Sequence, residues 1–105
     1  MTSIRSKYGA VKVAGYASKA EARRAAELKL AQEAGVITDL REQVRWKILP
    51  SQDGERPVHY VCDFQYRDCK GQLVVEDVKG VKTREYVLKR KMLLFVHGIK
   101  IREVA

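Results

Sequence analysis

The sequence predicts a small α/β domain with the element order helix, three strands, helix, strand. Three observations support this prediction. An alanine-rich, charged stretch from residue 18 to 35 opens with a helix-capping signal and ends at a glycine. Apolar and polar residues alternate over residues 43–49 and 58–66, as they do in half-buried strands. Helical spacing of apolar residues returns over residues 83–98, and a last apolar segment, 99–104, follows.

The first helix is expected to begin at Ser18. Glu21 lies three residues later and completes a Ser-x-x-Glu capping box, and Gly35 supplies the stop signal. Leu28 and Leu30, with the alanines, provide the apolar contacts, which leaves a basic outer face. Two interpretations of Glu21 remain open. Its carboxylate either caps the helix only, or points toward the neighbouring sheet and belongs to a site.

The three strands are expected to form an antiparallel meander. Val44, Trp46 and Ile48 alternate with charged residues in the first strand, so Trp46 is predicted to be a core residue rather than a platform for base stacking. Residues 50–57, with two prolines and an Asp-Gly pair, form the turn to the second strand. The third strand lies around residues 73–79.

Two acids are predicted to face each other across the second hairpin. Asp63 and Asp77 lie directly opposite if the turn is centred on Lys70, because side chains alternate strictly along each strand. A three-residue loop, 69–71, with Gly71 in the left-handed conformation, satisfies this register.

Side-chain parity places Lys79 on the face of Asp77 and turns Glu76 to the other face. Two opposed carboxylates repel in a purely structural sheet, but a divalent cation bound between them attracts both and makes the arrangement favourable. Oxygen ligands suit Mg²⁺ or Mn²⁺, which keep bound water that can serve as a nucleophile, and Lys79 could orient that water. The alternative is that Asp63 and Asp77 lie at exposed strand ends, or that Asp77 only pairs with Lys79.

The second helix is expected to follow a cap at Thr83 and to end at Gly98, and the strand 99–104 then runs parallel to the third strand. Its apolar residues form a broad surface that packs on the sheet: Tyr86, Val87, Leu88, Met92, Leu93, Phe95 and Val96. The side chains expected to contact nucleic-acid phosphates are Lys82, Thr83, Arg84 and Lys89 near the start of this helix, Arg24 on the first helix, and Lys7 and Lys12 in the N-terminal arm.

Composition favours a nucleic-acid partner. Lysine and arginine number 21 against 13 acids, a net charge of +8 on 105 residues. We expect a basic N-terminal arm, 1–17, and one domain, 18–105, for which a homodimer would be a natural way to bury more surface. No apolar run is long enough to span a membrane and no secretory signal opens the chain, so a soluble intracellular protein is expected.

The cysteines and histidines indicate no site of their own. Cys62 and Cys69 are too few for a disulfide framework, and a zinc site that joins them with His59 lacks a fourth ligand. Cys62 is expected in the core and Cys69 in the turn. His59 and His97 have no neighbouring nucleophile and are predicted to pack as polar side chains.

The acid, hairpin and (D/E)-x-K pattern, here Asp63 followed by Asp77-Val78-Lys79, resembles the PD-(D/E)XK nuclease superfamily. More narrowly, the chain is similar to a family of short phage and prophage proteins, which is catalogued as a domain of unknown function and grouped with these endonucleases. The segments that carry this similarity are 18–24, 60–64 and 76–80, with Thr83 and Tyr86. No proline precedes Asp63, a position that the superfamily treats loosely.

The resemblance implies an αβββαβ core of the restriction-endonuclease type, with helices on the sheet faces. It also implies that Glu21, Asp63 and Asp77 bind Mg²⁺ or Mn²⁺, that Lys79 serves the attacking water, and that the protein acts in the cytoplasm of a bacterial host. We therefore expect a metal-dependent endonuclease that hydrolyses DNA, with branched or otherwise structured DNA as a candidate substrate. The alternatives are a DNA-binding accessory module without turnover and a factor whose basic surface engages an acidic protein.

Overall fold

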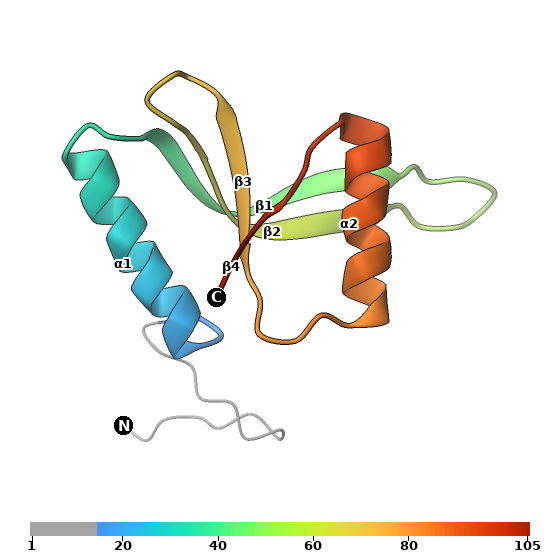
Figure 1. Ribbon diagram of the computed structural model, residues 1–105. Coiled ribbons are helices and arrows are strands. Elements are labelled where there is room, and N and C mark those ends of the chain that lie inside the picture. The colour runs from blue at the N-terminus through green and yellow to red at the C-terminus, as the bar shows by residue number, and fades with distance from the viewer. Residues whose placement is uncertain (1–14) are drawn as a thin grey trace.

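The computed structural model describes residues 15–105, and the expected contacts of Lys7 and Lys12 therefore lie outside the described residues. Figure 1 shows two helices and a sheet in the predicted order. The elements are α1 (Lys19–Glu33), β1 (Thr38–Leu49), β2 (Val58–Arg67), β3 (Leu73–Val78), α2 (Arg84–His97) and β4 (Arg102–Val104).

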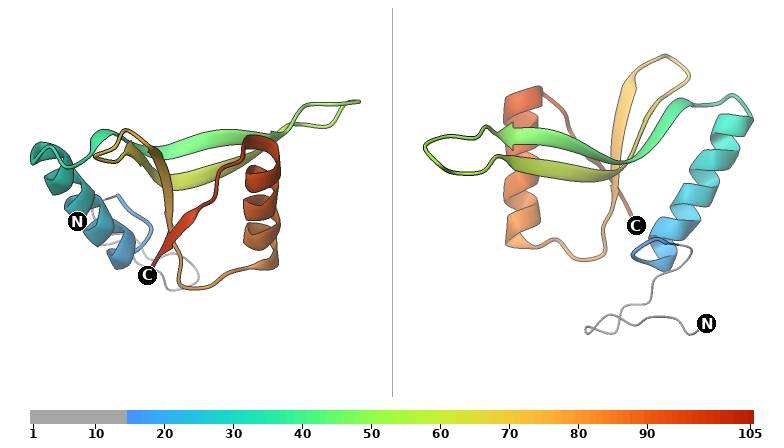
Figure 2. Two further views of the ribbon diagram at one scale, coloured as in Figure 1. Left: turned by 45° about the horizontal axis from the view of Figure 1, so that its top comes forward. Right: turned by 180° about the vertical axis from the view of Figure 1, so that it is seen from behind.

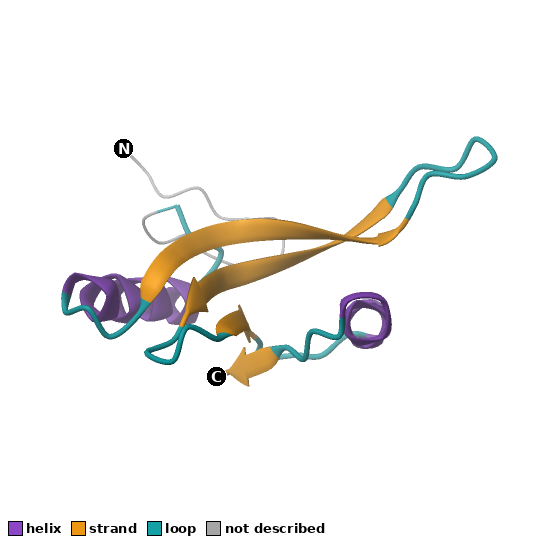
Figure 3. Cartoon of the chain, turned by 90° about the horizontal axis from the view of Figure 1, so that it is seen from above, coloured by secondary structure: helices purple, strands orange, loops and turns teal. Residues whose placement is uncertain are grey.

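The four strands form one mixed sheet in the order β1-β2-β3-β4. The first three are antiparallel neighbours, and β4 runs parallel to β3, as predicted. β3 and β4 lie between α1 and α2 (Figures 1 and 3). The β1–β2 hairpin extends past α2, so that residues 50–57 project from the body of the molecule (Figure 2).

Both helices begin and end at the predicted signals. The Ser18 hydroxyl accepts a hydrogen bond from the Glu21 backbone N–H at 3.1 Å, and the Thr83 hydroxyl does the same for the N–H of Tyr86 at 3.1 Å. Gly35 follows the end of α1 with φ of 77°, and Gly98 caps α2 with φ of 68°. These left-handed conformations are ones that glycine adopts without steric cost.

The β2–β3 hairpin has the predicted register. Phe64 pairs with Glu76 and Tyr66 with Val74, which centres the turn on Lys70. Gly71 takes the left-handed conformation with φ of 78°. Continued by one residue, this register places Asp63 opposite Asp77, as the sequence predicts.

The core has two parts, one under each helix. Cys62, Tyr60 and Val75 pack with Leu93 of α2, whereas Phe64 and Tyr66 pack with residues of α1. Tyr60, Cys62, Phe64 and Tyr66 alternate along a single strand, as predicted, and all are buried. Because the sheet is strongly twisted, one face of β2 packs against α2 along its first half and against α1 along its second half.

The predicted core roles of Trp46 and Cys62 are confirmed. Trp46 packs against the core under α2, and its indole N–H donates to the Gln65 side chain at 3.0 Å. Cys62 is fully buried, and Cys69 lies exposed in the turn. The His97 ring meets Trp46 edge-on and its Nε2 lies 2.6 Å from the Lys47 carbonyl oxygen, so it packs as a polar side chain as expected.

The expectation that the whole apolar surface of α2 packs on the sheet is wrong. Leu93 is fully buried, but Leu88 is 59% exposed and Phe95 is 90% exposed. The apolar residues surround more of the helix than one sheet face can cover, so part of them faces outward. The last strand is also shorter than predicted, because only residues 102–104 pair with β3 while Ile101 joins the core.

Within the described part of the chain, neither helix has the length and apolar character that a membrane crossing requires.

Truncation at two leucines of α2 tests this packing. Leu93→Ala is expected to lower the free energy of unfolding by about 2–5 kcal/mol, because it opens a cavity beneath the helix. Leu88→Ala, the matched exposed change, is expected to cost no more than about 0.5 kcal/mol. Urea unfolding followed by circular dichroism measures both, and equal losses would contradict the packing described.

Candidate active site at the end of β3

The β2–β3 ladder ends where the two predicted acids meet. Asp77 Oδ1 accepts a hydrogen bond from the Asp63 backbone N–H at 2.9 Å, and Asp63 Oδ2 accepts one from the N–H of Val78 at 2.8 Å. Carboxylate oxygens thus replace the carbonyl oxygens that a continued ladder would supply. The strands separate at this point with their backbone donors satisfied.

Asp77 is the most buried acid of the group, with 1% of its surface exposed. Its second oxygen, Oδ2, accepts a hydrogen bond from the Tyr60 hydroxyl. Burial raises the pKa of Asp77 to about 6, although the Asp63 N–H and the charge of Lys79 act in the opposite direction. The carboxylate therefore titrates close to neutral pH.

Glu21 comes to the same place from the first turn of α1. It is 8% exposed, and burial raises the pKa of its carboxyl. The charge of Asp63 adds to this effect and that of Lys79 opposes it. Because Asp77 also contributes to the raised pKa of Glu21, the other three side chains predicted for the site all lie within electrostatic reach of Glu21. The structure thus brings the predicted residues together.

Lys79 follows the end of β3, where its backbone N–H donates to the Val104 carbonyl at 3.0 Å. Its ammonium lies 4.8 Å from the centroid of the Tyr86 ring, within the range of a cation–π contact. A cavity of about 220 Å³ borders Lys79, Tyr86 and Thr83. The ammonium thus lies near the start of α2, beside this cavity.

A second cavity, of about 330 Å³, borders Glu21 and Asp63. Its wall also contains Glu42 and Gln43 of β1, which sequence reasoning missed. Glu42 further raises the pKa of Glu21. Gln43 has a φ of 55°, a conformation that costs a residue with a side chain about 1–2 kcal/mol. An ordinary alternating strand pattern contains no signal for that backbone conformation.

The neighbouring acid, Glu76, is a structural residue. It is fully buried and receives two hydrogen bonds from the Arg24 guanidinium, at 2.8 and 2.7 Å, and one from the Tyr66 hydroxyl. Burial raises the pKa of Glu76, but these donors outweigh it and hold the pKa below its ordinary value. Arg24 also pairs with Glu27 at 3.1 Å, so its guanidinium turns toward the protein rather than outward.

The other expected phosphate contacts lie around the start of α2. Lys82 pairs with Glu103 at 3.1 Å, and Lys89 pairs with Glu85 at 3.4 Å. Arg84 is exposed. The N-terminal ends of both helices and the C-terminal end of β3 lie at the same end of the molecule (Figure 1). This arrangement favours anions, because helix N-termini carry partial positive charge.

The donor set fits a hard divalent cation by chemistry and by charge. Glu21, Asp63 and Asp77 offer carboxylate oxygens, and a cation would offset both the burial and the neighbouring negative charge that raise the pKa of Glu21. Over residues 15–105, however, no three acids, cysteines or histidines gather closely enough to hold a metal ion as they stand. Both oxygens of Asp77 accept a hydrogen bond from the protein, so this carboxylate is already held in one orientation.

The raised pKa of Asp77 makes stability depend on pH. Its folded-state pKa of about 6 lies above the ordinary value of 3.8, so the folded protein holds an extra proton between these values. The resulting stabilisation is full below about pH 4 and is lost as the pH rises through 6. Asp77→Asn should remove this dependence. Between pH 4 and 7 the free energy of unfolding of the wild type is expected to fall, relative to that of the variant, by on the order of 2–3 kcal/mol. Urea unfolding at each pH measures it, and parallel curves would exclude a raised pKa.

Substitutions at Gln43 should show an inverted order of stability. At an ordinary strand position valine is more favourable than glycine. At a φ of 55° glycine is unstrained and a β-branched residue is strongly disfavoured. The free energy of unfolding should therefore be about 1–2 kcal/mol higher for Gln43→Gly than for Gln43→Val. The matched pair Arg45→Gly and Arg45→Val, two residues along β1, should show the normal order in the same thermal unfolding experiment.

Comparison with known proteins identifies a family without assigning an activity. The sequence model of a family described as "Protein of unknown function (DUF1064)" matches residues 5–103. Nothing among the curated proteins and nothing among the solved structures matches the chain. Because the match extends over nearly the whole sequence, the chain belongs to the DUF1064 family.

Proposed function

We propose that this protein is a metal-dependent endonuclease that hydrolyses phosphodiester bonds in DNA at the C-terminal end of β3. The observation that carries the proposal is the convergence of three carboxylates and one ammonium, from α1, β2 and β3, at the point where the β2–β3 ladder ends. Asp63 and Asp77 both lie within electrostatic reach of Glu21, and this concentration of negative charge is unfavourable unless a cation offsets it.

The surroundings of the site suit a polyanionic substrate. Both helices direct their N-termini toward this end of the molecule (Figure 1), and the chain carries a net charge of +8. Lys82, Arg84 and Lys89 lie around the start of α2, next to Lys79. Phosphates on either side of a bound strand would therefore meet cations near the acids.

Glu21 and Asp63 would hold Mg²⁺ or Mn²⁺ from the cavity that they border, with Asp77 behind them. Such an ion supplies a water of lowered pKa and draws charge from a phosphate oxygen. Lys79 would orient the attacking water and offset the negative charge that builds on the phosphate. Tyr60 and the Asp63 N–H fix the orientation of the Asp77 carboxylate by binding one oxygen each.

The resemblance to the PD-(D/E)XK superfamily supports the same assignment of roles. Asp63 and Asp77-Val78-Lys79 stand in the strand, turn and strand context that the pattern requires. The element order αβββαβ agrees with the fold that the resemblance implies. A phage or prophage origin, action in a bacterial cytoplasm and a preference for branched DNA are further parts of this proposal, and they rest on the resemblance.

A DNA-binding module without turnover is the second candidate. One observation favours it. Each oxygen of Asp77 already accepts a hydrogen bond, from Tyr60 or from the Asp63 backbone, so the carboxylate has protein partners without any ion. In that case the acids stabilise the open end of the sheet, and the basic surface alone binds DNA.

Cleavage of a supercoiled plasmid and of a branched oligonucleotide in the presence of Mn²⁺ tests the proposal. Lys79→Ala and Asp63→Asn are expected to lower the cleavage rate by about a hundredfold or more, because Lys79 would act on the attacking water and the phosphate and Asp63 would hold the metal ion. The matched controls are Lys70→Ala and Asp53→Asn, which change exposed turn residues and should cleave like the wild type. Cleavage that persists in the site variants would reject this site.

Calorimetry separates the two candidates without relying on turnover. Titration of Mn²⁺ at pH 6 should give saturable binding with release of protons, because a cation lowers the raised pKa values of Asp77 and Glu21. Proton release is read from the dependence of the heat on the buffer. DNA binding without Mn²⁺ binding would favour the module.

A further inference from the structure

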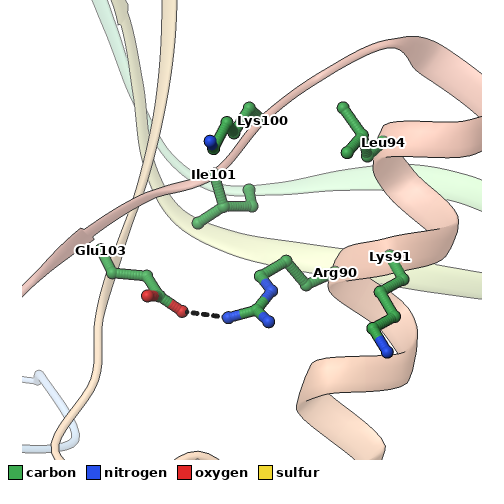
Figure 4. Close-up of a pocket in the computed structure, with 6 residues that line it drawn as sticks. All are labelled: Arg90, Lys91, Leu94, Lys100, Ile101 and Glu103. Carbon is green, nitrogen blue, oxygen red and sulfur yellow. Dashed lines mark hydrogen bonds and ion pairs between the residues drawn. The ribbon is translucent and has the colours of Figure 1, made fainter.

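A groove lies between α2 and the C-terminal segment (Figure 4), and its lining includes none of Glu21, Asp63 and Asp77. Its volume is about 380 Å³. Arg90, Lys91 and Leu94 line it from α2, and Lys100, Ile101 and Glu103 line it from the segment that leads into β4. None of these residues has a role in the proposed cleavage of DNA.

The groove has an apolar floor that continues over the outside of α2. Leu94 and Ile101 form its apolar part. On the same outer side of the helix Leu88 and Phe95 are 59% and 90% exposed, and they lie seven residues apart, which places them on one stripe. Leu88, Leu94 and Phe95 thus expose apolar side chains within two turns of one helix, above a floor formed by the buried Ile101, which is more than chance exposure of single residues explains.

The charge of this surface has one sign. Lys91 and Lys100 form no ion pair within residues 15–105. The acid of the groove, Glu103, is already bound by Arg90 at 2.8 Å and by Lys82 at 3.1 Å. The unpaired lysines and the exposed apolar side chains are therefore complementary to a partner that carries both carboxylates and apolar side chains.

Two other occupants fit less well. A second copy of the chain would bring another net charge of +8, and a two-fold axis through the middle of α2 would set Lys91 against its own copy. The N-terminal residues 1–17 contain Arg5, Lys7 and Lys12 and no acid, so they do not complement the cations. DNA would satisfy the lysines, but a phosphate backbone leaves Leu88 and Phe95 without a partner.

We infer that the surface formed by Leu88, Lys91, Leu94, Phe95 and Lys100 docks an acidic peptide segment of another protein. An apolar side chain of the peptide enters the groove between Leu94 and Ile101, and a second one covers Phe95. Carboxylates on either side pair with Lys91 and Lys100. The surface would thus recruit the protein to its place of action, whatever reaction the acids at the end of β3 perform.

A synthetic peptide of Asp, Glu, Leu and Phe is the probe, titrated into the ¹⁵N-labelled full-length protein. Two companion peptides carry Asn and Gln in place of the acids, or Ser in place of Leu and Phe. We expect saturable binding of the acidic apolar peptide, with chemical-shift changes confined to α2 and residues 99–104. The charge-reversed variant Lys91→Glu, Lys100→Glu should bind about tenfold more weakly or worse. The matched variant Lys19→Glu, Lys70→Glu, reversed at exposed positions of α1 and of the β2–β3 turn, should bind like the wild type.

Four results would overturn the inference. They are equal binding of the uncharged peptide, no saturable binding of the acidic peptide, shifts that fall outside α2 and the C-terminal segment, and displacement of the peptide by a DNA oligonucleotide that shifts the same residues. A homodimer in sedimentation experiments that Phe95→Asp dissociates would also overturn it, because a second copy would then be the occupant. Phe95 is 90% exposed, so this substitution leaves the core intact.

Discussion

The architecture depends on the paired hydrogen bonds between two carboxylates and two backbone N–H groups at the end of the β2–β3 ladder. Asp63 and Asp77 each accept a donor that would otherwise be left without a partner when the strands part. Because that end of the ladder is satisfied without a further strand residue, β3 can leave β2 and lead to α2, while α1 brings Glu21 to the opening.

Two consecutive acids of β3 show how differently the fold treats buried charge. Glu76 and Asp77 are both almost completely buried. Arg24 neutralises Glu76, whose pKa falls, so this pair fastens α1 to the sheet. Asp77 receives hydrogen bonds but contacts no cation in the described residues, and its pKa rises to about 6. The buried charge of Glu76 is thus neutralised by an arginine, whereas the buried carboxyl of Asp77 has only the Tyr60 hydroxyl and a backbone N–H as partners.

Much of this arrangement could be predicted from local sequence rules. Strand parity and the Gly71 turn fix the register that sets Asp63 against Asp77, and the caps fix both helices. Three-dimensional placement could not be predicted in the same way. Pairing of Arg24 with Glu76 joins residues far apart in the chain, the positive φ of Gln43 has no sequence signature, and the exposed side of α2 depends on how much sheet there is to cover it. The local periodicity of a helix does not show how much of its apolar surface the sheet will cover.

The long first strand has one more consequence. β1 forms an outer border of the sheet, and its free backbone groups would invite another chain to pair with it. Left-handed residues at Asp39 and Gln43 rotate the peptide groups and divide this border into short pieces, and Arg45 and Lys47 place like charges along the rest. A foreign strand therefore finds no continuous template. The kinked backbone beside the acids also protects the protein from fibre-like association.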